Sequence, residues 1–256
     1  MLPAATERIL ATVPDDAVVL DIGGWAAPFN RADWMLDLMP YESRGAMGSY
    51  GPRRERFSEK TWVVRDICDR EPWPFADGQF DFAICVTTLE DIRDPIWVCS
   101  EMARVAKAGY VEVPSVVAEL IYNVEGDGPY LGHEHHRWFV QIEGGELVFM
   151  HKPHSIHHDW KLRVLPRWRE RMTLEDHLQG MFWTDALPAR ERFLIGTQDY
   201  EDARSDLQAI LQEKFEPSGA EIAVKQARDL LRHNINLAKA PVRRVAEQVL
   251  DRLTRR

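Results

Sequence analysis

Three aspartates each close a short apolar run of strand length: Asp21, Asp37 and Asp66. A glycine pair, Gly23 and Gly24, follows the first of them. The carboxyl ends of parallel strands meet at one edge of an open α/β sheet, and nucleotide-like ligands bind at that edge. A carboxylate there can accept hydrogen bonds from both hydroxyls of a ribose. The pattern therefore predicts a nucleotide-like site at one sheet edge.

A second concentration of reactive side chains is a group of histidines. Seven of the nine histidines lie between residues 133 and 158: His133, His135, His136, His151, His154, His157 and His158. Imidazole has an ordinary pKa near 6.5 and serves as a general base. It also binds zinc, iron or nickel, although the spacing here matches no closed zinc site. Three interpretations stay open: structural or surface histidines, acid–base groups at a substrate site, or metal ligands.

The apolar runs predict the elements that position these groups. Strands are expected at residues 17–22, 33–38, 61–66, 80–86 and 110–113, each long enough for a strand that is covered on both faces. Helices are expected at residues 3–12 and 95–106, the second beginning at Asp94-Pro95. Residues 40–56, which contain several glycines and arginines, predict a long loop. The pattern indicates an α/β fold.

The second half of the chain has a different pattern. We expect a hairpin at residues 137–142 and 146–151, a helix near 173–183, a strand near 191–195 and a helix near 200–215. Pro217-Ser218-Gly219 marks a boundary, after which nine Lys/Arg and four Asp/Glu give residues 217–256 a charge of +5. Apolar residues from Val242 to Leu253 share one helical face. This basic helical extension is expected to pack on its own domain or to form a homo-oligomer.

Composition excludes several function classes. The net charge of -9 argues against nucleic acid as a partner, since a phosphate backbone requires a cationic surface. No run of about 18 apolar residues is present, so membrane insertion is not expected. Cys68, Cys85 and Cys99 form an odd set without metal-type spacing, which favours a reducing compartment, the cytoplasm. A small-molecule substrate fits this composition best.

Three segments resemble the class I S-adenosylmethionine-dependent methyltransferases, in the type-11 branch. Residues 19–27 resemble the family's first motif, in which an acid precedes a glycine-rich turn, although Trp25 and Ala27 replace its second and third glycines. Residues 73–82 resemble its "PF-D-FD" run, and residues 101–109 its "E-RV-G" run. The resemblance covers about residues 15–115. It implies a Rossmann-like fold, with a mostly parallel sheet and helices on both faces.

The resemblance implies S-adenosylmethionine as the cofactor. It assigns the ribose hydroxyls to Asp37, the adenine amine to Asp66, a ring nitrogen to the Ile67 amide, and the methionine part to the glycine turn. The cofactor-binding residues that it implies are Asp21, Gly23, Gly24, Trp25, Asp37, Leu38, Asp66, Ile67 and Thr87. We expect domain limits at residues 1–216, with a cofactor-binding core at 15–115 and a substrate-capping region at 116–216, followed by the extension at 217–256.

Family substrates lie over the ends of the fourth and fifth strands, which indicates where the methyl acceptor binds. The catalytic candidates there are His133, His135, His136 and Asp91. The expected reaction is O- or N-methylation of a glycan, lipid or secondary metabolite. Two alternatives remain: a binding or scaffold protein that has lost turnover, suggested by Trp25 and Asp91, and a metal-dependent enzyme that uses the histidines between His133 and His158.

Overall fold

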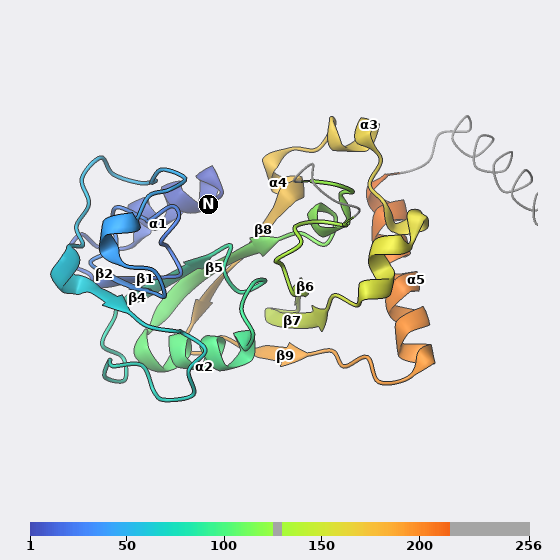
Figure 1. Cartoon of the computed structure of the whole chain (residues 1–256). Helices are drawn as coiled ribbons and strands as arrows, with labels where there is room; N and C mark the ends of the chain where they lie inside the picture. Colours follow the sequence, from blue (N-terminus) through green and yellow to red (C-terminus); the bar gives the residue numbers. More distant parts are fainter. Residues whose placement is uncertain (125–129, 216–256) are drawn as a thin grey trace, which may run out of the picture. The chain divides into compact units, whose positions relative to one another are not determined.

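The computed structural model describes residues 1–124 and 130–215 (Figure 1). The chain divides into two compact units, Met1–Leu211 and Gln212–Arg256. The account below concerns the first unit. The predicted boundary at Pro217, the basic extension and its apolar stripe lie outside the described residues.

A six-stranded sheet forms the centre of the first unit, in the order β3-β2-β1-β4-β5-β8. Five strands are parallel, and β8 runs antiparallel to β5. The strands are β1 (Val19–Ile22), β2 (Trp34–Asp37), β3 (Trp62–Val64), β4 (Phe82–Val86), β5 (Ala108–Pro114) and β8 (Leu178–Thr184). The five strands predicted from apolar runs are confirmed, and all but β5 are shorter than predicted.

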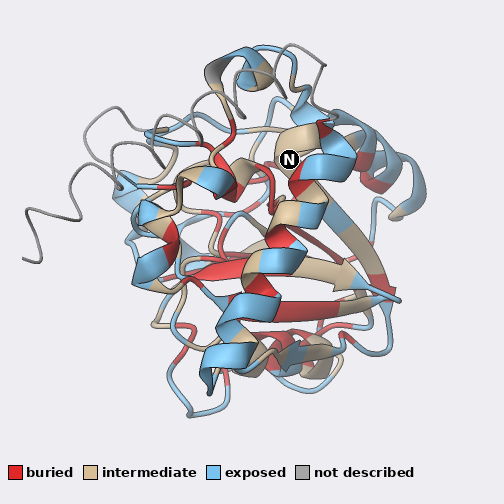
Figure 2. Ribbon diagram, turned by 90° about the vertical axis from the view of Figure 1, so that its right-hand side faces the viewer, coloured by how far each residue is buried: buried red, intermediate tan, exposed pale blue. Residues whose placement is uncertain are grey.

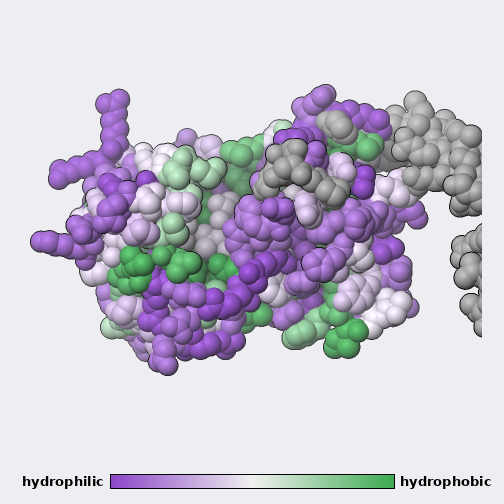
Figure 3. Space-filling view, in the orientation of Figure 1, coloured by the Kyte–Doolittle hydropathy of each residue, from purple (hydrophilic) through white to green (hydrophobic). Residues whose placement is uncertain are grey.

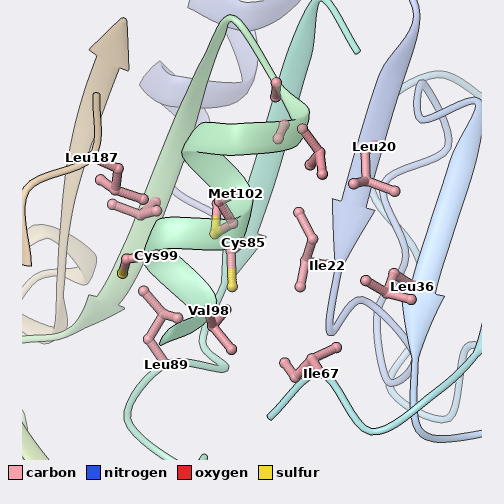
Figure 4. Packing of buried hydrophobic residues seen from close by; sticks show 14 of the residues in the cluster. Leu20, Ile22, Leu36, Ile67, Cys85, Leu89, Val98, Cys99, Met102 and Leu187 are labelled. Atoms are coloured by element: carbon pink, nitrogen blue, oxygen red, sulfur yellow. The ribbon is translucent and has the colours of Figure 1, made fainter. Parts of the chain in front are cut away.

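One helix covers each face of this sheet. On one face, α2 (Pro95–Val105) begins with the Asp94 side chain accepting a hydrogen bond from the Trp97 amide. Figure 4 shows Val98 and Met102 of α2 packed near Cys85 of β4. On the other face, α1 (Pro3–Thr12) packs Ala5 and Ile9 into a separate apolar cluster. The predicted α/β fold with helices on both faces is confirmed.

The two crossovers that precede β2 and β3 contain no α-helix. Residues 23–33, all of them described, form an irregular segment, and residues 38–61 contain only the short 3-10 helices η1 (Tyr41–Ser43) and η2 (Glu59–Thr61). Phe29 and Ala32 of the first crossover join the cluster of α1, and Phe29 stacks on Tyr50 with ring centroids 5.1 Å apart. These loop residues and α1 therefore cover the face that a crossover helix would otherwise cover.

The two segments with the most specific sequence resemblance contact each other. Glu101 of α2 accepts a hydrogen bond from the Trp73 amide at 2.7 Å and forms an ion pair with Arg104 at 2.7 Å. The Arg104 guanidinium also donates to the Phe75 carbonyl at 2.9 Å and the Asp77 carboxylate at 2.8 Å. Residues 73–82 and 101–109 thus hydrogen-bond to each other, and these contacts hold the loop before β4 against α2.

A small second sheet carries the region after β5. It contains β6 (Trp138–Glu143), β7 (Glu146–His151) and β9 (Ala189–Glu191), in the order β6-β7-β9. The hairpin predicted at residues 137–151 is confirmed. Further helices are η3 (Ala118–Leu120), η4 (His154–His158), η5 (Trp160–Leu162), α3 (Pro166–Arg169), α4 (Leu174–His177) and α5 (Thr197–Lys214).

Two predictions for this region are wrong. The helix expected at residues 173–183 is one turn, α4, followed by the strand β8. That strand pairs with β5 over seven residues, from Leu178 to Thr184, and buries Trp183. Backbone pairing with the edge of β5 therefore outweighs the helical spacing of the apolar residues in this segment. The strand expected near residues 191–195 lies earlier, at Ala189–Glu191, where it pairs in parallel with β7.

Burial follows these layers. Figure 2 shows buried residues concentrated on the strands, while the helices expose their outer sides.

The three cysteines are buried and form no disulfide. Figure 3 shows a mostly hydrophilic face with small apolar groups. No helix within residues 1–124 and 130–215 combines the length and hydrophobicity of a membrane span.

Candidate functional site

Asp21, near the end of β1, is a buried acid with one unsatisfied oxygen. Its side chain is 1% exposed, and Oδ2 accepts a hydrogen bond from the Phe29 amide at 2.9 Å. Among the described residues, Oδ1 has no hydrogen-bond partner. Burial raises the pKa of Asp21 to about 7, the Phe29 hydrogen bond opposes this shift, and the charge of Asp37 adds to it. Asp21 is therefore partly protonated near neutral pH.

The glycine turn after β1 packs tightly against the protein's own side chains. Gly23 has a φ of +74°, and a Cβ there would lie 2.4 Å from Cγ2 of Thr88. A Cβ on Gly24 would lie 2.3 Å from Oδ2 of Asp21. Both positions therefore require glycine because side chains of β1 and of the segment after β4 occupy the space. The glycines are thus needed for packing, in addition to the contact with the methionine part of the cofactor that the sequence resemblance implies.

Asp37 closes β2 and holds the glycine turn. Its carboxylate accepts hydrogen bonds from the Trp25 amide at 3.0 Å and the Met39 amide at 2.8 Å. Burial raises the pKa of Asp37, and these backbone hydrogen bonds oppose the shift. A carboxylate has about four acceptor positions, so these backbone hydrogen bonds leave room for a ribose hydroxyl. The neighbouring Leu38 is 64% exposed and offers an apolar surface beside them.

Asp66, the third acid, is engaged by an arginine that the sequence analysis did not identify. Arg93 Nη1 donates to Oδ2 of Asp66 at 2.6 Å, and the Cys68 amide donates to Oδ1 at 2.9 Å. Although burial raises the pKa of Asp66, the Arg93 hydrogen bond and ion pair hold it below its ordinary value. An adenine amine would have to share this carboxylate with Arg93. Ile67 is buried beside it.

The segment after β4 is strained at its first residue. Thr87 has a φ of +48°, which is unfavourable for a β-branched residue, and its amide donates to the Glu112 carbonyl at 2.8 Å. Such strain persists only where surrounding contacts impose it, and it is frequent at functional sites. Thr88 Oγ1 donates to the Gly23 carbonyl at 3.3 Å, so this segment borders the glycine turn.

The hairpin of the second sheet is tied to the segment after β4. The Glu90 carbonyl accepts hydrogen bonds from the amides of Arg137 at 2.7 Å and Trp138 at 3.2 Å. The Trp138 indole donates to the Ile92 carbonyl at 2.8 Å. These contacts bring the residues just before β6 next to Asp91.

The four catalytic candidates meet there, and we call His133, His135, His136 and Asp91 the histidine–aspartate cluster. The His133 ring centroid lies 5.5 Å from that of His135 and 4.6 Å from that of His136, and the latter two are 4.7 Å apart. The Nε2 atoms of His135 and His136 each lie 3.8 Å from an oxygen of Asp91. Two further histidines make different contacts: His151 packs on Trp138, and His157 accepts a hydrogen bond from the Leu131 amide.

A buried ion pair supports the cluster from behind. Glu119 Oε1 lies 2.5 Å from Nδ1 of His136, and Oε2 accepts from Lys152 at 2.7 Å. Lys152 also donates to the carbonyls of Leu131 at 3.0 Å and His133 at 3.3 Å. Burial raises the pKa of Glu119, but the His136 and Lys152 contacts outweigh it and lower the pKa overall. Sequence reasoning missed Glu119 and Lys152, because no periodic pattern marks either residue.

Glu90 is a second buried acid near this group. Its side chain is 0% exposed, and neither oxygen has a hydrogen-bond partner among the described residues. Burial, with smaller contributions from Asp91, Glu119 and Glu112, raises the pKa of Glu90 well above its ordinary value. Burial therefore favours the protonated form of this side chain.

Part of the chain matches a known protein family. Residues 36–111 match a family described as "Methyltransferase domain". The resemblance to the class I methyltransferases is thereby confirmed. The matching segment includes Asp37, Asp66, Thr87 and Asp91 but neither the glycine turn nor the histidines. S-adenosylmethionine is the cofactor of this family, and Asp37 fits it with its remaining acceptor positions. No curated protein matches the chain.

Several solved structures are similar over part of the chain. A putative methyltransferase from Haloferax volcanii, in complex with the Trm112 activator, is 20% identical over 42% of this chain and 50% of its own, with a TM-score of 0.30. One from Bacillus halodurans is 18% identical over 44% and 50%, with a TM-score of 0.32. A SAM-dependent methyltransferase from Thermotoga maritima, titled a possible histamine N-methyltransferase, is 18% identical over 52% and 62%, with a TM-score of 0.32. The chain thus spans half to about three fifths of these relatives.

Proposed function

We propose that the protein transfers a methyl group from S-adenosylmethionine to an oxygen or nitrogen of a small-molecule acceptor. The observation that carries this proposal is the position of the histidine–aspartate cluster. Asp91 comes from the segment after β4, within the methyltransferase match, and the three histidines come from the cap before β6. Groups that can accept a proton therefore border the edge of the sheet at which the cofactor is expected.

The cofactor supplies an activated methyl group on a sulfonium, so the protein's own task is to hold the two reactants in line. Asp37 would hold the ribose hydroxyls, and the exposed apolar side chain of Leu38 would lie against the cofactor. The Asp66 carboxylate would accept from the adenine amine, and the Ile67 amide would face a ring nitrogen. Gly23, Gly24, Trp25 and Asp21 would shape the end that receives the methionine part.

His133 is the proposed general base for a hydroxyl acceptor. His136 is fixed by its contact with Glu119 and is largely buried, with 9% of its side chain exposed. His133 is also partly buried, and its ring packs against that of His136 at a centroid distance of 4.6 Å. We therefore infer that the acceptor proton passes to His133, while His135, His136 and Asp91 position the acceptor. The substrate classes we propose are glycans, lipids and secondary metabolites, and the proposed location is the cytoplasm.

The test combines cofactor affinity with turnover in the full chain. S-adenosylhomocysteine binding is measured by calorimetry, and release of the demethylated cofactor is followed with a panel of alcohol and amine acceptors. His133→Ala is expected to keep cofactor affinity while lowering turnover by about 10²–10⁴-fold, the range for loss of general-base help. His158→Ala is the matched control, because His158 is an exposed histidine outside the cluster.

Two results would contradict the proposal. Wild-type turnover in His133→Ala, His135→Ala, His136→Ala and Asp91→Ala would remove the cluster from the reaction. Normal cofactor binding with no turnover on any acceptor would favour a binding or scaffold protein that retains the fold.

A further inference from the structure

We propose that the histidine–aspartate cluster binds a divalent transition-metal ion of the zinc type. This inference concerns the ion alone and does not depend on methyl transfer. One ring nitrogen from each of His133, His135 and His136 lies within 4.8 Å of the others. Three imidazoles and one carboxylate form a donor set typical of zinc, and it contains too few oxygens for magnesium or calcium.

The separation of the rings fits a shared ion. A ligating nitrogen lies about 2 Å from zinc, which puts the ring centre about 3 Å away, so the ring centres of two tetrahedral ligands are about 5 Å apart. The three observed centroid separations are 4.6, 4.7 and 5.5 Å. The ring centres therefore have the spacing of three imidazoles around one ion, and the ring nitrogens, which lie within 4.8 Å of one another, would close to about 3.3 Å on binding.

Asp91 supplies the fourth donor. Its Oδ1 is buried and has no hydrogen-bond partner among the described residues, although His136 Nε2 lies 3.8 Å away. Its Oδ2 lies at the same distance, 3.8 Å, from Nε2 of His135. Both separations are too long for a hydrogen bond. Donor atoms around a tetrahedral zinc are about 3.3 Å apart, so each of these two Asp91–histidine pairs would have to close by about half an ångström.

The contact behind His136 is an independent observation that favours a metal. A histidine that binds a metal usually donates a hydrogen bond from its other ring nitrogen to a carboxylate. This hydrogen bond fixes the tautomer and the orientation of the ring. Glu119 Oε1 contacts Nδ1 of His136 at 2.5 Å, and Nε2 of the same ring faces Asp91. Lys152 neutralises Glu119 through its 2.7 Å contact, which leaves the Asp91 carboxylate to balance the charge of the ion.

An ion at this position would change the role of His133. A metal-bound nitrogen has no lone pair for a proton, so His133 cannot ligate and act as base at the same moment. A hydroxyl bound to a zinc-type ion loses its proton more readily, as zinc-bound water does. The ion would then activate the hydroxyl in place of His133, and the released proton would pass to solvent water.

The experiment uses the full chain with any purification tag removed. Zinc binding is measured by equilibrium dialysis and elemental analysis, and Co²⁺ is used as a probe of tetrahedral coordination by visible absorption. We expect one ion per chain and a tetrahedral cobalt spectrum. His135→Ala and Asp91→Asn should each weaken binding at least 100-fold, and Glu119→Gln by about 10–100-fold, as for other groups behind a ligand. The double variant His154→Ala/His158→Ala, which removes two histidines outside the cluster, should bind normally.

The outcomes separate this inference from the proposed function. The absence of a stoichiometric ion, or an ion that survives both His135→Ala and His133→Ala in folded protein, overturns the inference and leaves the methyltransferase proposal standing. An ion that is lost equally in the double control variant also overturns it. Stoichiometric binding that depends on the cluster supports the inference, whether or not chelation changes turnover. Circular dichroism of each variant shows whether a loss reflects unfolding.

Discussion

Replacing Asp21 with asparagine is expected to change how the stability of the protein depends on pH. In the folded protein the Asp21 carboxyl has a pKa of about 7, because burial opposes its ionisation. In the unfolded chain the pKa returns to its ordinary value of 3.8. Asparagine has the same shape and can accept the Phe29 hydrogen bond through its amide oxygen, but it cannot ionise. The variant therefore removes the titration and leaves most of the packing in place.

The direction of the effect follows from the two pKa values. Between about pH 4 and pH 7 the folded protein holds a proton that the unfolded chain has lost, so the free energy of unfolding falls as pH rises through this window. Below the window both states are protonated, and above it both are ionised. A shift of about 3 pKa units corresponds to about 4 kcal/mol between the two limits. This is a large part of the stability of a typical domain, which is about 5–15 kcal/mol.

Urea unfolding measures this difference. The free energy of unfolding of wild type and Asp21→Asn is determined at about pH 5 and about pH 8, and the advantage of the variant should grow by about 2–3 kcal/mol between them. Other groups titrate in the same range, but they contribute equally to both proteins and cancel in the comparison. Asp16→Asn, at an exposed aspartate, serves as the control and should show a constant difference from wild type.

A difference between wild type and Asp21→Asn that stays constant between the two pH values would refute the reasoning. It would mean that the buried Oδ1 is solvated or paired in solution, although no described residue pairs with it here. Asp21 would then be ionised throughout, and its position under Gly24 would carry no electrostatic cost.

Three further predictions concern the sheet edge and the cluster. Asp37→Ala should weaken S-adenosylhomocysteine binding at least tenfold in calorimetry, because it removes a charged acceptor of two hydrogen bonds worth up to about 1.5–3 kcal/mol each; an unchanged dissociation constant in folded protein would exclude Asp37 from the site. Asp66→Ala should cause a smaller loss in the same assay, because Arg93 already occupies its Oδ2 at 2.6 Å; a larger loss would reverse this ranking of the two acids. Lys152→Met should lower the free energy of unfolding by about 3–5 kcal/mol in urea, because it leaves buried Glu119 without its cation; a loss below about 1 kcal/mol would show that solvent reaches Glu119.

Local sequence patterns determined the central sheet and the positions of its acids. The runs that end at Asp21 and Asp37 are apolar because their strands are covered on both faces, and β1 and β2 lie where these runs predicted. The start of α2 followed from Asp94-Pro95, since capping depends on residues within one turn. The sequence also predicted that the catalytic candidates lie close together, because the histidines follow the fifth strand and Asp91 follows the fourth.

Tertiary structure decided the contacts that no local pattern contains. Residues after α4 have a spacing that suits a helix, yet they form β8 because the edge of β5 offers a seven-residue ladder. Arg93 meets Asp66 from 27 residues away, and Lys152 meets Glu119 from 33 residues away. Such pairs depend on how the segments after β3, β4, β5 and β7 converge, and loop paths follow no period of 2 or 3.6 residues. Burial then sets the protonation of Asp21 and Glu90, because the energy of a charge depends on the three-dimensional surroundings and not on its neighbours along the chain.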